Sequence, residues 1–307
     1  MILLCGIPSE APIARVRAAL DELAMPYLEF NQRRFDEANL WFEISDGRLA
    51  GELCIGAKRY PVERFTGIYT RVMDDRFLPE LRDEPPLSSR RRHCRALHDA
   101  MQHWLEITPA RVVNRTAPMT SNGSKPLQAQ LIRSHGFAIP DTLVTNEPRA
   151  VLEFRAEHTR IVYKSTSGIR SIVREFQDDD VRRLEHIRWC PVQFQALVPG
   201  IDVRVHVVGD QVFATGISSE AADYRYAGRD GEPARLTPFD LPDEIAARCA
   251  RLADALQLPF AGVDLRLGPD GTAYCFEVNP SPGFSYYEAE TGQPIALAVA
   301  RYLAGLH

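Results

Sequence analysis

The chain opens with a change from a strand pattern to a helical pattern and back. Residues 2–7 form an apolar run, residues 13–23 place apolar side chains at helical spacing, and residues 27–30 form a second apolar run. This order predicts a β-α-β unit. The turn after the first strand lacks the GxGxxG sequence of dinucleotide-binding folds, so nothing predicts a nucleotide at this point.

Later segments also alternate between strands and helices. A serine caps a predicted amphipathic helix at 88–106, and a Gly-Asp turn indicates a hairpin between 203–208 and 211–217. A GPDG turn joins two strands at 262–267 and 273–278. The other predicted strands lie at 40–44, 52–55, 67–73, 142–144, 160–164, 171–175 and 192–198, and the other helices at 125–134, 148–155 and 243–256.

Length and charge narrow the class of protein. The 307 residues suggest about two domains. Against 41 Asp and Glu, 36 Lys and Arg give a net charge of −5, so no overall basic field would attract nucleic acid or an anionic membrane. Arg90, Arg91 and Arg92 open the helix at 88–106, either as a solvated face or as a contact for an anion or a peptide.

Cysteine usage and hydropathy indicate the compartment. The six cysteines include no CxxC pair, which fits neither a disulfide framework nor a zinc ribbon and favours a reducing environment. No basic residues precede the first apolar run, and no uncharged apolar stretch approaches the roughly 18 residues of a spanning helix. We therefore expect a cytoplasmic protein that binds neither nucleic acid nor membrane.

Three oxygen-bearing side chains converge near the C-terminus of the predicted fold. Glu277 and Asn279 are two residues apart and share a face of an extended strand, and the hairpin can bring Asp264 beside them. Hard oxygen donors in this number suit magnesium. A carboxylate in a hairpin is more often structural, but the flanking sequences AGVDLRL and YCFEVN are of buried type, where an unpaired carboxylate is costly.

Two lysines are candidates for contacts with phosphate. Lys164 ends the apolar run IVYK and precedes STSGIRS, a loop of small residues whose backbone N–H groups can cover a phosphate. A surface lysine beside an ordinary turn is the alternative. Lys125 opens a predicted helix, which by itself is ordinary.

In combination these motifs resemble the ATP-grasp carboxylate-amine ligases, such as glutathione synthetase and the ribosomal-protein glutamate ligases. The order is Lys125, Lys164 with its loop, FQALVPGIDVRVHVVGD, GVDLRL and FEVNPSPG. The resemblance spans residues 112–307 and implies an ATP-grasp fold, of mixed α+β and α/β class, with ATP between two subdomains. It implies an N-terminal α/β (pre-ATP-grasp) domain at 1–110, a central subdomain at 111–192, and a C-terminal subdomain with the metal site at 193–307.

The resemblance also implies the residues that bind ATP. Lys125 and Lys164 match the family's two phosphate-contacting lysines, residues 165–171 its mobile loop, and residues 194–198 the hinge whose backbone pairs with adenine. Ala196, beside Gln195, replaces the acidic residue common in that hinge. The implied contacts are Lys125, Lys164, Ser165, Ser167, Gly168, Ser171, Gln195, Ala196, Leu197, Val198 and Asp202.

Catalytic roles follow from the same likeness. Asp202 and Arg204 match the family's D-x-R pattern, in which the arginine usually faces phosphate or acyl phosphate. Arg266 stands two residues beyond Asp264 on the same face and could do similar work, with a structural salt bridge as an equal alternative. The implied catalytic residues are Arg204, Arg266 and Lys164, and the implied metal ligands are Asp264, Glu277 and Asn279.

Family chemistry accounts for the absence of other motifs. Such ligases transfer the γ-phosphoryl group of ATP to a carboxylate, and an amine or hydroxyl then attacks the acyl phosphate. Magnesium and cationic side chains neutralise charge, and positioning supplies most of the rest. No nucleophilic side chain is needed, which agrees with the lack of GxSxG and HExxH motifs.

A closer likeness is to the maturases that form ester or amide crosslinks in ribosomally made peptides. It rests on VVNRTAPMTSNGSKPLQAQLIRSHGFAIPDTLVT and on NPSPG followed by YYEAETGQPIALAVARYL. Three functions remain open: a peptide-modifying ligase, a ligase for small amino acids or metabolites, and a catalytically silent ATP-binding scaffold. Loss of Lys164, Glu277 or Asn279 would mark the scaffold, and all three are present. Because many of these ligases are dimers, a homodimer is also open.

Overall fold

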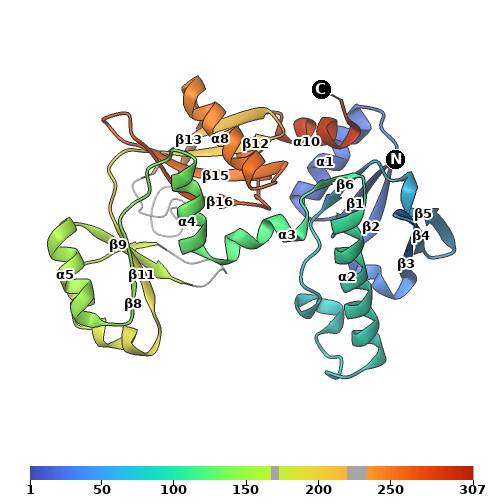
Figure 1. The fold of residues 1–307 in the computed structure, drawn as a ribbon, viewed down its shortest axis with the longest axis horizontal. Helices are drawn as coiled ribbons and strands as arrows, with labels where there is room; N and C mark the ends of the chain where they lie inside the picture. The colour runs from blue at the N-terminus through green and yellow to red at the C-terminus, as the bar shows by residue number, and fades with distance from the viewer. Residues whose placement is uncertain (167–172, 220–233, 307) are drawn as a thin grey trace.

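The computed structural model describes residues 1–166, 173–219 and 234–306. Within these residues the chain forms four sheets, and Figure 1 shows them as an N-terminal lobe, a C-terminal sheet in the middle and a smaller antiparallel sheet at the far end. No helix in the described ranges is both long and apolar enough to cross a membrane.

The N-terminal lobe is built on a parallel sheet. Its first strand is buried along its whole length because it lies between two strands and is covered on both faces. The strands, in spatial order, are β2 (Tyr27–Asn31), β1 (Ile2–Gly6), β6 (Gly67–Thr70) and β7 (Arg111–Val113).

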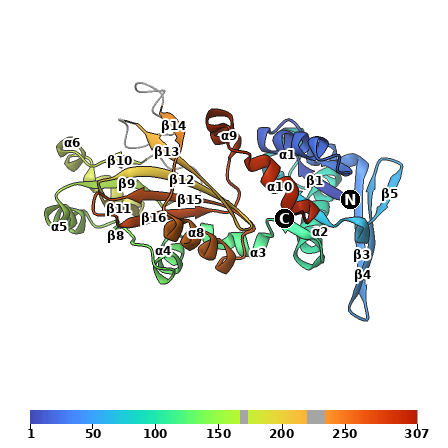
Figure 2. The same cartoon turned by 90° about the horizontal axis from the view of Figure 1, so that it is seen from above.

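Helices cover both faces of the parallel sheet. On one face α1 (Ala11–Glu22) lies beside α10 (Ile295–Ala304), as Figure 2 shows, and the other face packs against α2 (Ser89–Ile107). Because side chains alternate along β1, Ile2 and Leu4 join the first core and Leu3 and Cys5 the second. The last helix of the chain and β7, which begins at residue 111, therefore complete the N-terminal lobe.

A three-stranded antiparallel sheet projects from the N-terminal lobe (Figure 2). It consists of β3 (Ala38–Ser45), β4 (Arg48–Ile55) and β5 (Lys58–Pro61). Short 3₁₀ segments join this sheet to the lobe; they are η1 (Gln32–Glu37), which is kinked at Arg34, and η2 (Val62–Arg64). Two more, η3 (Asp75–Phe77) and η4 (Pro79–Leu81), follow β6.

The far sheet is antiparallel and carries its own apolar core. Its order is β10 (Arg174–Glu175), β9 (Ile161–Ser165), β11 (Val192–Ala196) and β8 (Thr142–Thr145). Val151 of α5 (Pro148–His158), Leu184 of η6 (Leu184–Trp189) and Phe194 of β11 belong to this core. A four-residue helix, α6 (Asp178–Val181), precedes η6. Since side chains alternate along a strand, Lys164 and Gln193, which pair in register, lie on the opposite face.

The C-terminal sheet separates apolar from polar side chains. Val203, Val205 and Val207 pack under α4 (Lys125–Ser134) and α8 (Asp243–Ala255), so the residues between them face the other way. The strand order is β14 (Arg235–Pro238), β13 (Gln211–Ser218), β12 (Ile201–Val208), β15 (Phe260–Leu267) and β16 (Ala273–Asn279). The remaining elements are α3 (Thr116–Met119), η5 (Thr120–Gly123) and α9 (Ser285–Thr291).

Asn114 ties the N-terminal lobe to the C-terminal sheet. Its side chain donates to the carbonyls of Phe260 and Pro280 and accepts from the N–H of Phe260, 3.1 Å away. These residues begin β15 and follow β16, so the buried amide fixes the end of β7 against both strands. Leaving such a group unsatisfied typically costs about 1–3 kcal/mol.

Most of the predicted elements are confirmed. The hairpin is present, with Val208 opposite Gln211, and α4 has the predicted bounds. The predicted strand at 67–73 ends at Thr70. Of the predicted strand at 171–175, the first two residues lie outside the described ranges and only Arg174–Glu175 is a strand. All six cysteines carry free thiols.

Candidate functional site

One face of the C-terminal sheet gathers most of the predicted site residues. Arg204 and Asp202 of β12 lie opposite Asp264 and Arg266 of β15. Glu277 of β16 lies opposite Asp264 in turn. Because the valines between these positions are buried on the other face, the polar side chains have no alternative direction.

The three predicted metal ligands lie together on this face. Nδ2 of Asn279 is 3.1 Å from Oδ2 of Asp264 and 3.1 Å from Oε1 of Glu277. Two carboxylates and one amide thus meet at the edge of β15 and β16. The donor set fits magnesium, because the oxygen and nitrogen of an amide exchange places on rotation and a third oxygen can then face the same point.

Lys125 reaches this cluster from the first turn of α4. Its Nζ is 2.8 Å from Oε2 of Glu277 and 2.8 Å from Oδ1 of Asn122. Burial raises the pKa of a carboxyl group, but the charges of Lys125 and Lys164 and the hydrogen bond from Asn279 lower the pKa of Glu277 to about 2. Glu277 is therefore ionised at neutral pH.

Arg204 is the most enclosed charge of the face, with 6% of its surface exposed. Its Nη1 is 2.5 Å from Oδ1 of Asp264, and its guanidinium lies 5.7 Å from the centre of the Tyr287 ring. A Cβ at residue 262 would come within 2.1 Å of Nη2, so only glycine leaves room for the guanidinium. The surrounding chain thus fixes the direction of Arg204.

Arg266 is held in a different way. Its Nε and Nη2 donate to the two carboxylate oxygens of Asp202, each at 2.7 Å, and its Nη1 donates to the carbonyl of Val198 at 2.9 Å. The guanidinium also lies over the Phe276 ring. Arg266 therefore forms the salt bridge that the sequence left as an alternative, and this bridge braces the segment after β11.

Lys164 belongs to the far sheet and faces the C-terminal sheet. Its charge acts on Glu277, although the two residues belong to different sheets. The chain has only three lysines, at 58, 125 and 164, against 33 arginines. Two of the three therefore act on one carboxylate. Ser165 is the exposed last residue of β9, whereas Ser167, Gly168 and Ser171 lie outside the described residues.

The predicted hinge, residues 194–198, consists of the end of β11 and the two residues after it. The N–H of Ala196 donates to the carbonyl of Asp141, and that of Leu197 donates to the carbonyl of Arg160, both at 3.0 Å. The side chain of Gln195 donates to Thr142. Within the described ranges the N–H of Val198 has no backbone acceptor, and residue 199 is proline, so the N–H of Val198 is the hinge donor left for a base.

Sequence reasoning missed residues that support the site. Gln128, one helical turn beyond Lys125, is buried and bonds to both backbone groups of Val278, at 2.8 and 3.0 Å. It fixes α4 against β16 and so sets the place of Lys125. The sequence offered one indication of this role: Gln128 stands three residues after Lys125 and therefore lies on the same face of the helix. Tyr287, whose ring lies against the guanidinium of Arg204, belongs to α9, and nothing in the sequence around it predicted this contact.

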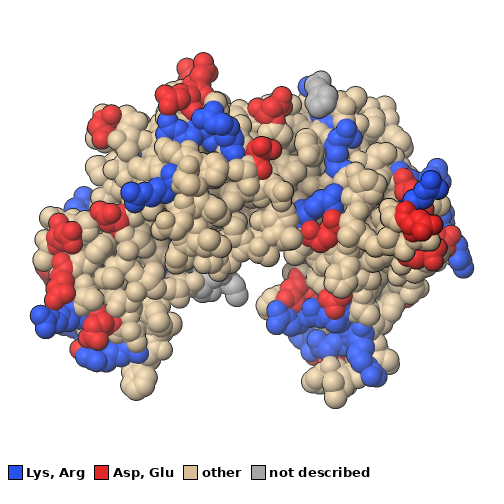
Figure 3. Space-filling model, in the orientation of Figure 1, with Lys and Arg blue, Asp and Glu red and all other residues tan. Residues whose placement is uncertain are grey.

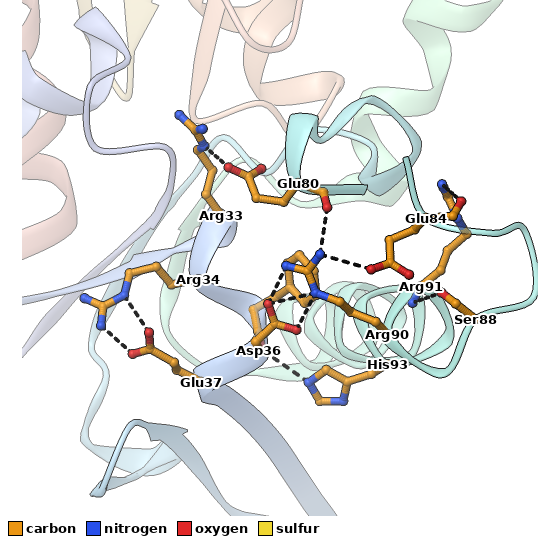
Figure 4. Close-up of polar contacts among 11 residues, drawn as sticks. Arg33, Arg34, Asp36, Glu37, Glu80, Glu84, Ser88, Arg90, Arg91 and His93 are labelled. Atoms are coloured by element: carbon orange, nitrogen blue, oxygen red, sulfur yellow. Dashed lines mark hydrogen bonds and ion pairs between the residues drawn. The ribbon is translucent and has the colours of Figure 1, made fainter. Parts of the chain in front are cut away.

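Two of the three arginines that open α2, Arg90 and Arg91, bind within the N-terminal lobe (Figure 4), and Arg92 is exposed. Nη2 of Arg90 is 2.7 Å from Oδ2 of Asp36, and the hydrogen bonding of Asp36 to Arg90 lowers the pKa of this carboxyl group. Nη1 of Arg90 also donates to the carbonyl of Glu80, at 2.8 Å. Arg91 donates to the carbonyls of Leu81 and Glu84. These arginines therefore join η1 and η4 to α2.

Comparison with known proteins identifies the fold of this site. A family model described as the RimK-like ATP-grasp domain matches residues 128–303, which is more than half of the chain. The chain belongs to the RimK-like ATP-grasp family. The predicted ATP-grasp fold is thereby confirmed.

Curated relatives match this chain over part of their own length. A probable alpha-L-glutamate ligase of Photobacterium profundum is 28% identical over 206 residues, which cover 62% of this chain and 66% of the relative. The chain thus matches slightly less than two thirds of that relative's length.

Solved ATP-grasp structures match over nearly the whole chain. A RiPP-associated ATP-grasp ligase of Chryseobacterium gregarium, in complex with ADP and a leader and core peptide, has a TM-score of 0.83 at 21% identity and covers 99% of this chain and 96% of its own. The ATP-grasp ligase PsnB, complexed with a variant of its minimal precursor, Mg and ADP, has a TM-score of 0.77 at 26% identity, with 99% and 97% covered.

Proposed function

We propose that this RimK-like protein is an ATP-dependent ligase that activates a carboxylate as an acyl phosphate and joins it to an amine or a hydroxyl. The observation that carries the proposal is the convergence of Lys125, Glu277, Asn279 and Asp264, with Lys164 facing them from the other sheet. Cations and hard oxygen donors in one place suit a polyphosphate.

In this proposal ATP lies between the far sheet and the C-terminal sheet. Lys125 and Lys164 bind the phosphates as point charges, and Ser165 follows Lys164 at the end of β9. Ser167, Gly168 and Ser171, which the resemblance assigns to ATP, lie outside the described residues. Adenine lies at the hinge formed by Gln195, Ala196, Leu197 and Val198, with the N–H of Val198 as its donor. Asp202 supports the hinge through Arg266 rather than through the nucleotide.

Asp264, Glu277 and Asn279 would hold magnesium, which when bound supplies charge neutralisation at the phosphate oxygens. Arg204, fixed by Asp264 and Tyr287, is oriented for the developing charge on the transferred phosphoryl group. The donor carboxylate displaces ADP and becomes an acyl phosphate, and the acceptor then displaces inorganic phosphate. Positioning carries most of this chemistry, so the enclosure of Arg204 matters as much as its charge.

A peptide is the proposed substrate. Solved neighbours that match 99% of this chain were obtained with precursor peptides, and a hollow between the lobes is open in Figure 3. The relatives' name, alpha-L-glutamate ligase, favours a second candidate, the addition of free glutamate or another small amino acid. In both cases the donor is a carboxylate and ATP is the phosphoryl source.

The ligase function is tested by magnesium-dependent ADP release by the purified protein. Light scattering on the same sample measures whether the protein is a homodimer. One reaction contains an equimolar mixture of the twenty L-amino acids, and another contains short peptides encoded beside the gene. Peptide-dependent release with a mass loss of one water per crosslink supports the peptide ligase, and release with gain of an amino-acid residue supports the second candidate. ATP binding without release in either reaction would contradict both.

A further inference from the structure

A cavity of about 490 Å³ lies between the N-terminal lobe and the C-terminal sheet, outside the cluster around Glu277. Glu10 comes from the loop after β1, Thr70 from the end of β6 and Arg71 from the loop after it. Gln102 and Thr116 come from α2 and α3, and Ser281 from the segment after β16. The cavity is therefore shared between the two halves of the molecule.

Its position in the parallel sheet is typical of a ligand site. In the order β2-β1-β6-β7, the strand that comes first in the sequence, β1, lies between the next two parallel strands. The chain passes from β1 to β2 on one side of it and later to β6 on its other side, so the strand order reverses between β1 and β6. In open parallel sheets, ligands bind beyond the carboxyl ends of the strands where the order reverses. The loops after β1 and β6 are the loops at this point.

The cavity reaches the segment that follows the predicted metal ligand Asn279. Nη1 of Arg71 is 2.9 Å from Oγ of Ser281. Ser281 stands two residues beyond Asn279, so their Cα atoms are at most ~7 Å apart. A molecule in the cavity therefore lies next to the end of β16, where the phosphoryl chemistry of the proposed function takes place.

The charged residues of the cavity favour the acyl acceptor over the carboxylate donor as its ligand. Among the described residues that line it, only Glu10 and Arg71 are charged, and Nε and Nη2 of Arg71 both donate to Oε1 of Glu10, at 2.8 and 2.6 Å. The pair is neutral overall, so a carboxylate would enter beside Glu10 without a compensating charge, which is unfavourable. Oε2 of Glu10 accepts neither of these bonds, so it is the oxygen of this carboxylate that can take a proton from a ligand.

We infer that this cavity binds the acyl acceptor, a side-chain hydroxyl or a neutral primary amine, and that Glu10 accepts its proton; the inference rests on the proposed ligase function. As the acceptor's oxygen or nitrogen bonds to the acyl carbon, the carbon–oxygen bond to phosphate breaks and phosphate leaves with that electron pair. The proton of the acceptor passes to Oε2 of Glu10. Gln102, Thr116 and Ser281 supply further hydrogen bonds to the acceptor.

The test separates carboxylate activation from ligation by means of Glu10→Gln, which keeps the shape of the side chain. Hydroxylamine traps an acyl phosphate as a hydroxamate and is too small to need an acceptor site. With the amino-acid mixture and the encoded peptides as substrates, we expect E10Q to form hydroxamate within about 3-fold of wild type while ligated product falls by about 10²–10⁴-fold. Glu29→Gln, which removes a carboxylate paired with Arg17 in the same sheet, is the control and keeps both activities.

The other outcomes overturn the inference. Ligated product at the wild-type rate in E10Q excludes Glu10 as the proton acceptor, and a parallel loss of hydroxamate and product assigns Glu10 to folding or activation. Failure of the wild type to form any hydroxamate contradicts the ligase function itself, and the acceptor site with it.

Discussion

Nζ of Lys125 lies 2.8 Å from Oε2 of Glu277, although 152 residues separate the two in the chain. The side chains are 20% and 19% exposed, so the ion pair is largely withdrawn from water. It brings the start of α4 to the oxygen cluster formed by Asp264 of β15 and by Glu277 and Asn279 of β16. The buried amide of Gln128 keeps the two elements at this distance.

Replacing this carboxylate tests the oxygen cluster. We expect Glu277→Gln to lower magnesium-dependent ADP release by at least about 10²-fold, because the variant removes the charge that the metal and Lys125 both require. Lys125 keeps its hydrogen bond to Asn122 but loses its ion pair, which costs about 1–3 kcal/mol of stability, and urea unfolding should still be cooperative. Glu175→Gln, which removes a carboxylate paired with Arg160 in the far sheet, is the control; equal activity of the two variants would contradict the assignment.

The lysine of the far sheet is tested by Lys164→Ala. We expect ligation to be lost while the fold remains, because Lys164 acts on charge at the phosphates and its side chain lies outside the apolar core of that sheet. Lys58→Ala changes an exposed lysine of β5 and should keep full activity. Turnover of K164A at the wild-type rate would refute the role of Lys164.

The enclosure of Arg204 is tested at a neighbouring glycine. We expect Gly262→Ala to displace the guanidinium, because the new Cβ would lie 2.1 Å from Nη2 and 2.8 Å from Pro282. Overpacking of this kind costs about 1–3 kcal/mol, measured by urea unfolding, and ADP release should fall with it. Gly283→Ala lies in the adjacent loop with no atom within 4 Å of the new Cβ, and should be neutral. Matching effects of the two variants would show that the position of Arg204 is unimportant.

His206 should make stability depend on pH. It is fully buried, neither ring nitrogen has a hydrogen-bond partner among the described residues, and burial followed by the charge of Arg204 holds its pKa well below 6.5. Below pH 6.5 the unfolded chain therefore binds a proton that the native state does not, and the free energy of unfolding falls as the pH is lowered, by up to about 1.4 kcal/mol per unit. Above pH 6.5 this contribution is constant.

Urea unfolding at pH 7.5, 6.5 and 5.5 measures this dependence. His206→Leu should flatten the loss of stability below pH 6.5, whereas the exposed His103→Gln should leave it unchanged. The same slope in wild type and H206L would show that other groups cause the acid sensitivity.

Local patterns predicted the parts of the site that lie within one hairpin. Alternation places Glu277 and Asn279 on one face, and the short turn brings the strand of Asp264 beside them. The pairing of Asp264 with Glu277 also needs the β-bulge between Asp264 and Leu265, which the turn does not encode. The family resemblance added Lys125 and Lys164. Their meeting at Glu277 depends on how α4 and the far sheet pack on β16, which no local period encodes.

Long-range contacts account for what the sequence could not supply. The bridge from Arg266 to Asp202 spans 64 residues, and its alternative, a contact with phosphate, has the same local pattern. The cavity beside Glu10 is closed by an arginine 61 residues away and by Ser281, 210 residues beyond that arginine. Neither the loop after β1 nor the loop after β6 shows by itself that it meets the other half of the chain.

Chemical labelling of lysine tests the proposed phosphate site at Lys125 and Lys164, because the chain contains only three lysines. The protein is acetylated with and without magnesium and ATP, and the modification of each lysine is measured by mass spectrometry. We expect ATP to protect Lys125 and Lys164 at least about 10-fold while Lys58 reacts equally in both samples. Equal labelling of all three lysines in the presence of saturating ATP would contradict the proposed phosphate site.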